Sequence, residues 1–229
     1  MRGEPSRIVL AVLILLMPSC RAEAKTPVAI ELVLALDCSA SVDGQEFQLQ
    51  ITGLAAAFKD PDVLQAIDNL RPFGVALSVV QWGAPGETRV VVPFTWIENS
   101  RDAKAFGFRA SLIPRWIRAS ATSIASGIND SVALIDSSGF EGQRKVIDVS
   151  GDGQDNSTVD LSDARALAKL SGITVNGLPI ASDDKGLAAY YQERVIIGAD
   201  AFVEPASGFE DFARAIKEKL LRELRPLGS

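Results

Sequence analysis

The sequence contains no histidine and only two cysteines, Cys20 and Cys38. Without histidine, neither a Ser-His-Asp triad nor a Cys-His nucleophile can form, and a metal site built on imidazole is excluded. Two cysteines are also too few for a thiolate metal site. Any metal chemistry must therefore rest on oxygen ligands, which favours hard cations such as Mg²⁺.

Long apolar segments are also missing, apart from a short run near the amino terminus. Ile8 to Met17 is apolar, follows the basic residues Arg2 and Arg7, and precedes the small-x-small cleavage pattern Ala22-Glu23-Ala24. The run is too short to span a membrane as a helix. We therefore expect a signal peptide over residues 1–24 and an exported protein, periplasmic or secreted, with no integral membrane segment in the mature chain.

Cys20 leaves a second interpretation of the leader open. Met17-Pro18-Ser19-Cys20 is similar to a lipoprotein cleavage site with an acylated cysteine, although Met and Pro are unusual there. If cleavage instead follows Ala24, Cys20 is removed and Cys38 has no partner for an internal disulfide. Cys38 is then expected to be a small buried residue rather than a reactive thiol.

Basic residues are outnumbered in this chain. It holds 23 Lys and Arg against 29 Asp and Glu, a formal net charge of −6. This acidity argues against nucleic acid or an anionic membrane surface as a partner. A length of 229 residues, of which 47% are hydrophobic, with no repeat or linker, fits a single globular domain, expected over residues 25–229.

Apolar, strand-like segments alternate with amphipathic helical segments along the chain. The expected strands cover residues 30–36, 75–82, 88–96, 144–150, 173–180 and, briefly, 201–203, and helices fall between them, including a short one around 187–193. This alternation predicts an α/β fold with a doubly wound, mostly parallel sheet and helices on both faces. The turn signal at Gly83–Glu87 predicts that 88–96 returns antiparallel as an edge strand, where Pro93 is tolerated.

The first strand ends in Asp37-Cys38-Ser39-Ala40-Ser41. In an extended segment, alternation places Asp37, Ser39 and Ser41 on one side. One carboxylate and two hydroxyls provide half of an oxygen shell suited to Mg²⁺ or a similar ion. Taken alone, the motif is equally consistent with a serine-rich turn that caps the following helix.

Two further polar segments are expected at the same edge of the sheet. Thr122 lies where a helix opens, between the competing hydroxyls of Ser120 and Ser123, and this cluster is also consistent with simple helix capping. Asp152 follows the strand over 144–150, between two glycines that allow a sharp turn. In doubly wound sheets, ligands bind outside the carboxyl ends of the strands, where these groups are expected to lie.

These three segments resemble the metal-ion-dependent adhesion site of the von Willebrand factor A (vWA) domain, and the resemblance covers about residues 28–224. It assigns five residues to a divalent metal: Asp37, Ser39, Ser41, Thr122 and Asp152. The metal is expected to be Mg²⁺, with Mn²⁺ or Ca²⁺ as alternatives. Ser150-Gly151-Asp152-Gly153 is one residue longer than the family's Ser/Thr-Asp-Gly, so either the strand ends early or the loop bulges.

The resemblance also implies a function. In vWA domains, an Asp or Glu of a partner protein completes the ligands of the metal. We therefore expect a binding module with a protein partner rather than an enzyme. The chain is similar to an exported bacterial branch of the family that has no established role.

Two other interpretations remain. Gly151-Asp152-Gly153-Gln154-Asp155-Asn156 also resembles the last motif of haloacid-dehalogenase-type phosphatases, in which Asp37 would be the nucleophile that forms an aspartyl phosphate with Mg²⁺. That chemistry needs a second Asp two residues later as general acid, and Ser39 stands there. The third interpretation is a structural domain whose metal site is degenerate.

Overall fold

The computed structural model describes residues 24–182 and 184–225. The expected leader, including Cys20, lies outside the described residues apart from Ala24. The strands are β1 (Thr26–Asp37), β2 (Val75–Trp82), β3 (Thr88–Ile97), β4 (Phe140–Gly151) and β5 (Ile173–Pro179). The helices are α1 (Gly44–Ala57), α2 (Pro61–Asp68), α3 (Ser100–Ala110), α4 (Ile124–Asp136), α5 (Leu161–Leu170), α6 (Leu187–Tyr190) and α7 (Phe212–Glu223), with a π-helical turn η1 (Tyr191–Val195) and a 3₁₀ turn η2 (Phe209–Asp211).

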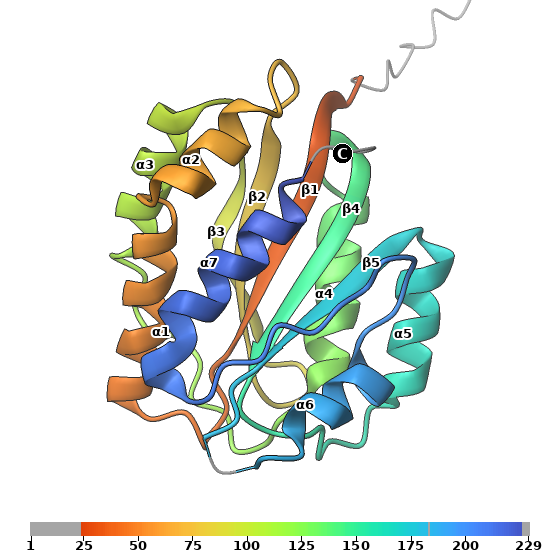
Figure 1. The fold of residues 1–229 in the computed structure, drawn as a ribbon. Helices are drawn as coiled ribbons and strands as arrows, with labels where there is room; N and C mark the ends of the chain where they lie inside the picture. Colours follow the sequence, from red (N-terminus) through yellow and green to blue (C-terminus); the bar gives the residue numbers. More distant parts are fainter. Residues whose placement is uncertain (1–23, 183, 226–229) are drawn as a thin grey trace, which may run out of the picture.

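The five strands form one sheet in the order β3-β2-β1-β4-β5 (Figure 1). β1 runs parallel to β2 and β4, β4 runs parallel to β5, and β3 is antiparallel to β2 at the edge. The fold predicted from the sequence, a mostly parallel doubly wound sheet with one antiparallel edge strand, is confirmed. The brief strand expected over 201–203 is reduced to an isolated bridge between Val203 and Gly177 of β5.

β1 is the centre of the molecule, and both of its faces are buried. Leu32 and Leu34 face a core formed with α1, α2, α3 and α7, whereas Val33 and Ala35 face a second core formed with α4 and α5. Each of these side chains is at most 1% exposed. Helices on both faces are the reason that this strand has a continuous apolar sequence. Full burial of such a leucine or valine contributes about 1.5–3 kcal/mol.

A capping box fixes the start of α1 just after the polar end of β1. The Asp43 side chain accepts hydrogen bonds from the amides of Gln45 and Glu46, and Glu46 accepts one from the Asp43 amide. Such a cap stabilises a helix by about 1 kcal/mol. The segment from Cys38 to Val42 is therefore held as a short connection between the buried strand and the capped helix.

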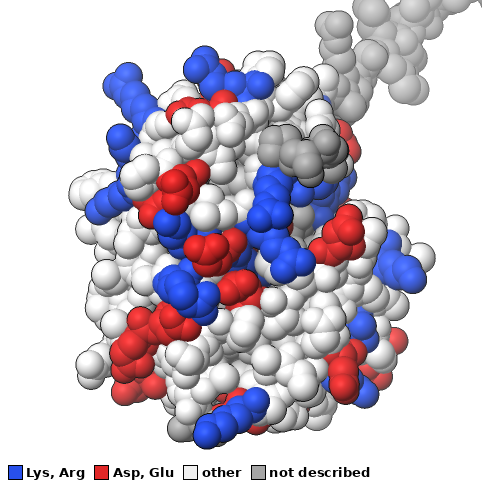
Figure 2. Space-filling view, viewed as in Figure 1, with Lys and Arg blue, Asp and Glu red and all other residues white. Residues whose placement is uncertain are grey.

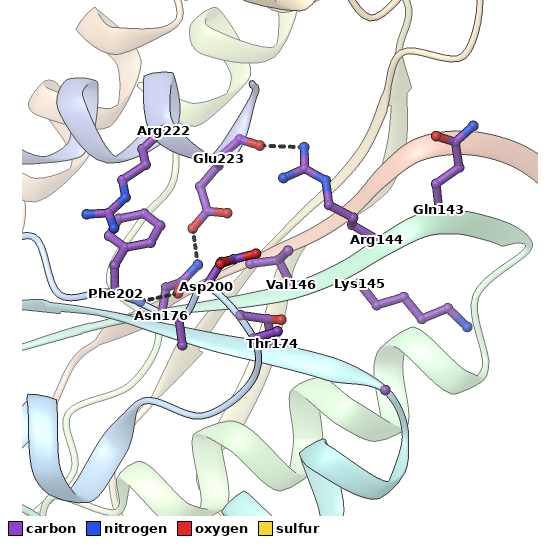
Figure 3. A pocket seen from close by; sticks show the side chains of 13 residues that line it. Gln143, Arg144, Lys145, Val146, Thr174, Asn176, Asp200, Phe202, Arg222 and Glu223 are labelled. Atoms are coloured by element: carbon purple, nitrogen blue, oxygen red, sulfur yellow. Dashed lines mark hydrogen bonds between the residues drawn. The ribbon is translucent and has the colours of Figure 1, made fainter. Parts of the chain in front are cut away.

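A buried polar cluster joins α7 to β4 and β5. The Lys219 ammonium nitrogen lies 2.7 Å from Asp148 Oδ1 and 3.7 Å from Glu223 Oε1. Asn176 Nδ2 donates to Glu223 Oε1 at 2.6 Å, and an Arg144 guanidinium nitrogen donates to the Glu223 carbonyl at 2.8 Å (Figure 3). These contacts fix where the last turn of α7 lies on the sheet.

Charges on the face that carries α7 are interleaved rather than separated (Figure 2). Lys217 pairs with Asp60 and Asp62, and Arg214 pairs with Glu204 and Asp211. This face therefore offers no extended basic surface for a phosphate backbone. In the described part of the chain, no helix combines the length and the apolar character needed to cross a membrane.

Candidate metal centre

Asp37 is the last residue of β1 and lies at the carboxyl edge of the sheet, next to Trp82 of β2. Its side chain is fully buried. Oδ1 accepts a hydrogen bond from the Ser39 amide at 2.7 Å. Oδ2 is also buried, and it has no hydrogen-bond partner among the described residues. An unsatisfied buried carboxylate oxygen is costly, and a bound cation would remove that cost.

Three of the other predicted ligands form a connected group beside Asp37. Ser39 Oγ lies 3.1 Å from Ser41 Oγ, and Ser41 Oγ donates to Asp152 Oδ1 at 2.7 Å. Ser39 is buried, whereas Ser41 is exposed. The loops that follow β1 and β4 therefore bring these side chains together, as the positions at the strand ends predicted.

Thr122 lies in the same hollow and is 6% exposed. Its amide donates to Asn156 Oδ1 at 2.9 Å, and its carbonyl accepts from the Asn156 amide at 3.0 Å. The competing hydroxyls have other places: Ser123 is the N-cap of α4, and Ser120 is exposed. The hollow is lined by Ala40, Ser41, Ser120, Ala121, Thr122, Asp152, Gly153, Gln154, Asp155, Asn156 and Asp184.

The electrostatics of the cluster favour a bound cation. Burial raises the pKa of Asp37 from 3.8 to about 7, against the lowering effect of the Ser39 amide, and the nearby charge of Asp152 raises it further. Two carboxylates in one partly buried site repel each other when both are ionised. A divalent cation between the two carboxylates would replace this repulsion by attraction and would favour the ionised form of both.

The donor set fits a hard divalent cation. Mg²⁺ commonly uses one or two protein carboxylates and retains water in its remaining positions. Within the described residues, no group of three or more His, Cys, Asp and Glu side chains is gathered as metal ligands. The hydroxyls of Ser39, Ser41 and Thr122 would therefore have to supplement the carboxylates of Asp37 and Asp152.

Gly151 accounts for the extra residue in the Asp152 motif. β4 continues through Gly151, which pairs with Pro179 of β5, so the strand does not end early. A Cβ atom on Gly151 would lie 2.8 Å from Asp37 Oδ2 and 2.9 Å from the Tyr191 hydroxyl. With any other residue at this position, the Asp37 or the Tyr191 side chain would have to shift, so glycine suits this close approach.

Several residues around the cluster were not predicted from the sequence. Tyr191 is fully buried, its hydroxyl has no hydrogen-bond partner within the described chain, and burial together with the charges of Asp37 and Asp152 raises its pKa well above 10. Asn156 holds the backbone of Thr122, and Arg115 donates to the Ser39 carbonyl at 2.9 Å. These are contacts between distant segments, and no local pattern marks them.

The phosphatase interpretation gains nothing from this geometry. The position that would need a second acid holds Ser39, whose hydroxyl contacts Ser41. Cys38 is a free, buried thiol, and burial raises its pKa to about 12, so it is no candidate nucleophile.

Comparison with known proteins identifies the family to which the chain belongs. Residues 27–227 match the family model described as "Protein of unknown function (DUF1194)". Comparison with curated proteins finds no match.

Solved structures of vWA domains are similar to this fold. Proximal thread matrix protein 1 from the mussel byssus, with a zinc-occupied MIDAS motif, has a TM-score of 0.60 at 14% identity, covering 89% of this chain and 48% of that one. The vWF domain of the type V pili tip protein Mfa5 from Porphyromonas gingivalis has a TM-score of 0.54 at 13% identity, covering 84% and 96%. A von Willebrand factor type A protein from Catenulispora acidiphila has a TM-score of 0.57 at 16% identity, covering 86% and 43%.

This chain spans about half the length of the mussel protein, and at such low identity the likeness concerns the fold alone. The family match, in contrast, extends over nearly all of the described residues. The chain therefore belongs to the DUF1194 family of proteins of unknown function, and its fold is vWA-like.

Proposed function

We propose that this protein is an exported binding module that uses a divalent cation, held by oxygen ligands, to grip an Asp or Glu side chain of a partner protein. The observation that carries the proposal is the buried Asp37 carboxylate, whose Oδ2 has no hydrogen-bond partner in the described structure and which lies beside the Ser39, Ser41 and Asp152 cluster. A cation is the group that this arrangement of oxygens fits.

Each predicted ligand has a distinct part in holding the ion. Asp37 and Asp152 would offset its charge, while Ser39, Ser41 and Thr122 would supply neutral oxygens. When bound, the ion would attract one further anionic oxygen, because two carboxylates leave a hard cation with coordination positions that water or a ligand can fill. Ser41 is exposed and reaches the open hollow, so a side chain from outside has access to this point.

The structural neighbours support a binding role over an enzymatic one. These neighbours include a byssal matrix protein with zinc in its MIDAS motif and a pilus tip protein. The described site contributes carboxylates and hydroxyls, and serine at position 39 cannot act as the general acid that phosphatase chemistry needs.

The first test is calorimetric titration of the protein with Mg²⁺, Mn²⁺ and Ca²⁺. Asp37→Asn should abolish binding, whereas Asp130→Asn, which alters an exposed carboxylate on α4, should leave it unchanged. Hydrolysis of p-nitrophenyl phosphate is assayed on the same samples. Metal-dependent turnover that Asp37→Asn abolishes would replace the binding proposal by the phosphatase.

The second test concerns the grip itself. Proteins captured from the native source by the wild-type chain in Mg²⁺ should be released by EDTA, and Asp37→Asn should not capture them. Capture that persists unchanged in EDTA would contradict a role for the metal in partner binding.

A further inference from the structure

The segment from Ser111 to Ser123, which links α3 to α4, is irregular but is firmly held. Gln81 of β2 is fully buried, and among the described residues its side chain forms hydrogen bonds with this segment alone. Its Nε2 donates to the Pro114 carbonyl at 2.8 Å, and its Oε1 accepts from the amides of Trp116 at 2.8 Å and Ile117 at 3.2 Å. One buried side chain thus satisfies three backbone groups of the segment.

Other contacts join the same segment to the loop after β1, which carries Ser39 and Ser41, and to the turn between β2 and β3. Arg115 donates to the Cys38 and Ser39 carbonyls at 3.3 and 2.9 Å. The Ser123 amide donates to the Gly83 carbonyl at 2.7 Å, and a Cβ on Gly83 would lie 2.3 Å from the Ala119 Cβ. The segment from Ser111 to Ser123 is therefore held in one conformation beside the candidate metal centre, and we call it the wall of the site.

This wall presents an aromatic and two cationic side chains to solvent. Trp116 is 54% exposed, and the Arg89 guanidinium carbon lies 3.9 Å from the centroid of its ring. Arg89 and Arg118 are exposed, and neither forms an ion pair with any described residue. Tryptophan and arginine held in a fixed geometry are the residue types that most often dominate binding energy at protein interfaces.

The wall borders two hollows. Ser120, Ala121 and Thr122 line the hollow over the candidate metal ligands. Trp116, Ile117 and Arg118 line a second hollow, together with Glu87, Thr88 and Arg89. A partner segment that reaches the metal would therefore have its neighbouring residues beside Trp116.

Charge distinguishes the two sides. The metal hollow is lined by the acidic residues Asp155 and Asp184 in addition to Asp152, whereas the second hollow has two arginines against one acid, Glu87. A second carboxylate of the partner is thus favoured on the arginine side and disfavoured on the other.

We propose that Arg89, Trp116 and Arg118 form a second contact surface for the same partner protein, one that takes an apolar side chain and a second carboxylate next to the acid that grips the metal. This inference rests on the proposed function, and it identifies the partner site as an acidic segment with at least two carboxylates around an apolar residue.

The test uses short synthetic peptides and fluorescence anisotropy with the full chain. The reference peptide has one Asp in a Gly/Ser background. A second peptide adds Leu and Glu on one side of that Asp, a third adds Leu and Lys, and each is made with the addition before or after the Asp. Binding is measured in excess Mg²⁺ and in EDTA, for the wild type and for Trp116→Ala, Arg118→Glu and the matched control Arg101→Glu on α3.

In Mg²⁺ we expect one of the Leu-Glu peptides to bind about tenfold more tightly than the reference and the Leu-Lys peptides. That gain should disappear in Trp116→Ala and Arg118→Glu and persist in Arg101→Glu. If the gain is absent, or survives both substitutions, the contact surface is refuted, while Mg²⁺-dependent binding of the reference peptide would still support the metal grip. If the protein binds Mg²⁺ but no peptide, both proposals fail.

Discussion

Asp37 is completely buried, and one of its carboxylate oxygens has no hydrogen-bond partner in the described structure. Burial raises its pKa to about 7 from the usual 3.8. A group with a raised folded-state pKa contributes stability that is fully present below its unfolded pKa and is lost as pH rises through the folded value. Without metal, the stability that comes from the protonated Asp37 carboxyl group is therefore lost progressively as pH rises from about 4 to about 7.

The first prediction follows from this sign. In EDTA, the wild-type free energy of unfolding should fall between pH 5 and pH 8 by up to an order of 3 kcal/mol more than that of Asp37→Asn, because about two of the roughly three pKa units of the shift lie above pH 5. Urea denaturation at the two pH values measures the difference. Asp130→Asn serves as the control and should follow the wild type. Equal losses in Asp37→Asn and the wild type would show that Asp37 is not the group responsible.

Tyr191 offers a second test beside Asp37. Its hydroxyl and Asp37 Oδ2 are both buried next to Gly151, and neither has a partner among the described residues. A hydroxyl in this place can donate to the carboxylate through a bridging water or after a small shift when metal binds.

We therefore expect Tyr191→Phe, which keeps the ring, to lower Mg²⁺ affinity about tenfold. The same substitution should not lower the free energy of unfolding in EDTA, because the buried hydroxyl that it removes has no partner among the described residues. Calorimetric titration and urea denaturation separate the two effects. Unaltered Mg²⁺ affinity would exclude a positioning role for the hydroxyl.

For single residues, the sequence could predict only those features that depend on nearby residues in the chain. Alternation in an extended segment predicted that Asp37, Ser39 and Ser41 share a side. In the structure β1 ends at Asp37 and the chain turns from Ser39 to Val42, so this turn rather than alternation brings the two serine hydroxyls together. The choice between Thr122 and Ser123 required the structure, because it depends on which residue caps α4. Tyr191 could not be predicted, since it lies near Asp37 only because both side chains approach Gly151, which belongs to another strand.

At the scale of elements, the apolar halves of the strands were predictable and their polar halves were not. The expected strand over 144–150 extends in the structure from Phe140 to Gly151. Its first residues pair with Thr26 and Pro27 at the start of β1, so the neighbouring strand rather than their own polar sequence makes them a strand. Likewise, the short helix expected around 187–193 ends in the π-helical turn η1, for which the sequence has no signal.

The third prediction concerns how α7 is held. Lys219 is the cation of a buried cluster with two carboxylates, Asp148 and Glu223. Burial raises the pKa of Glu223 from 4.5 to about 7; Lys219, Asn176 and Arg144 lower it, and Asp148 raises it. By the sign rule applied to Asp37, stability from this group is complete below pH 4.5 and is lost as pH rises through about 7.

Glu223→Gln keeps an oxygen that can accept from Asn176 but cannot ionise (Figure 3). Measured in an Asp37→Asn background, the stability of this variant relative to its parent should rise by up to an order of 3 kcal/mol between pH 5 and pH 8. Thermal or urea unfolding monitored by circular dichroism gives the comparison. A relative stability that does not change with pH would mean that Glu223 stays ionised throughout this range, with Lys219 as its counter-ion.

At the scale of the whole molecule, the strand pattern was sufficient to predict the architecture. Alternating apolar and amphipathic segments permit few topologies once crossovers are right-handed and both sheet faces are covered. That architecture brings the ends of β1 and β4 and the start of α4 to one edge, which is why separate motifs predicted one site. The position of Trp116 beside the site was not predictable, because it depends on the buried side chain of Gln81.

Because the candidate ligands come from the β1–α1 loop, the start of α4 and the end of β4, a bound ion would link segments from across the whole chain. Only the folded state gathers them, so the ion should stabilise the protein as a whole by mass action. At a free concentration one hundred times the dissociation constant, the gain is about 2.7 kcal/mol. For a domain of this size, that corresponds to a rise in Tm of roughly 5–10 °C.

The fourth prediction is that removing metal with EDTA lowers the wild-type Tm by this amount and that adding Mg²⁺ back restores it in proportion to the logarithm of its concentration. Scanning calorimetry near pH 7.5 measures the shift, with Asp37→Asn as the variant that should not respond and Asp130→Asn as the one that should. A wild-type Tm that is independent of Mg²⁺, Mn²⁺ and Ca²⁺ would identify the cluster as a degenerate site, and the vWA-like fold would then have to bind its partner without a metal.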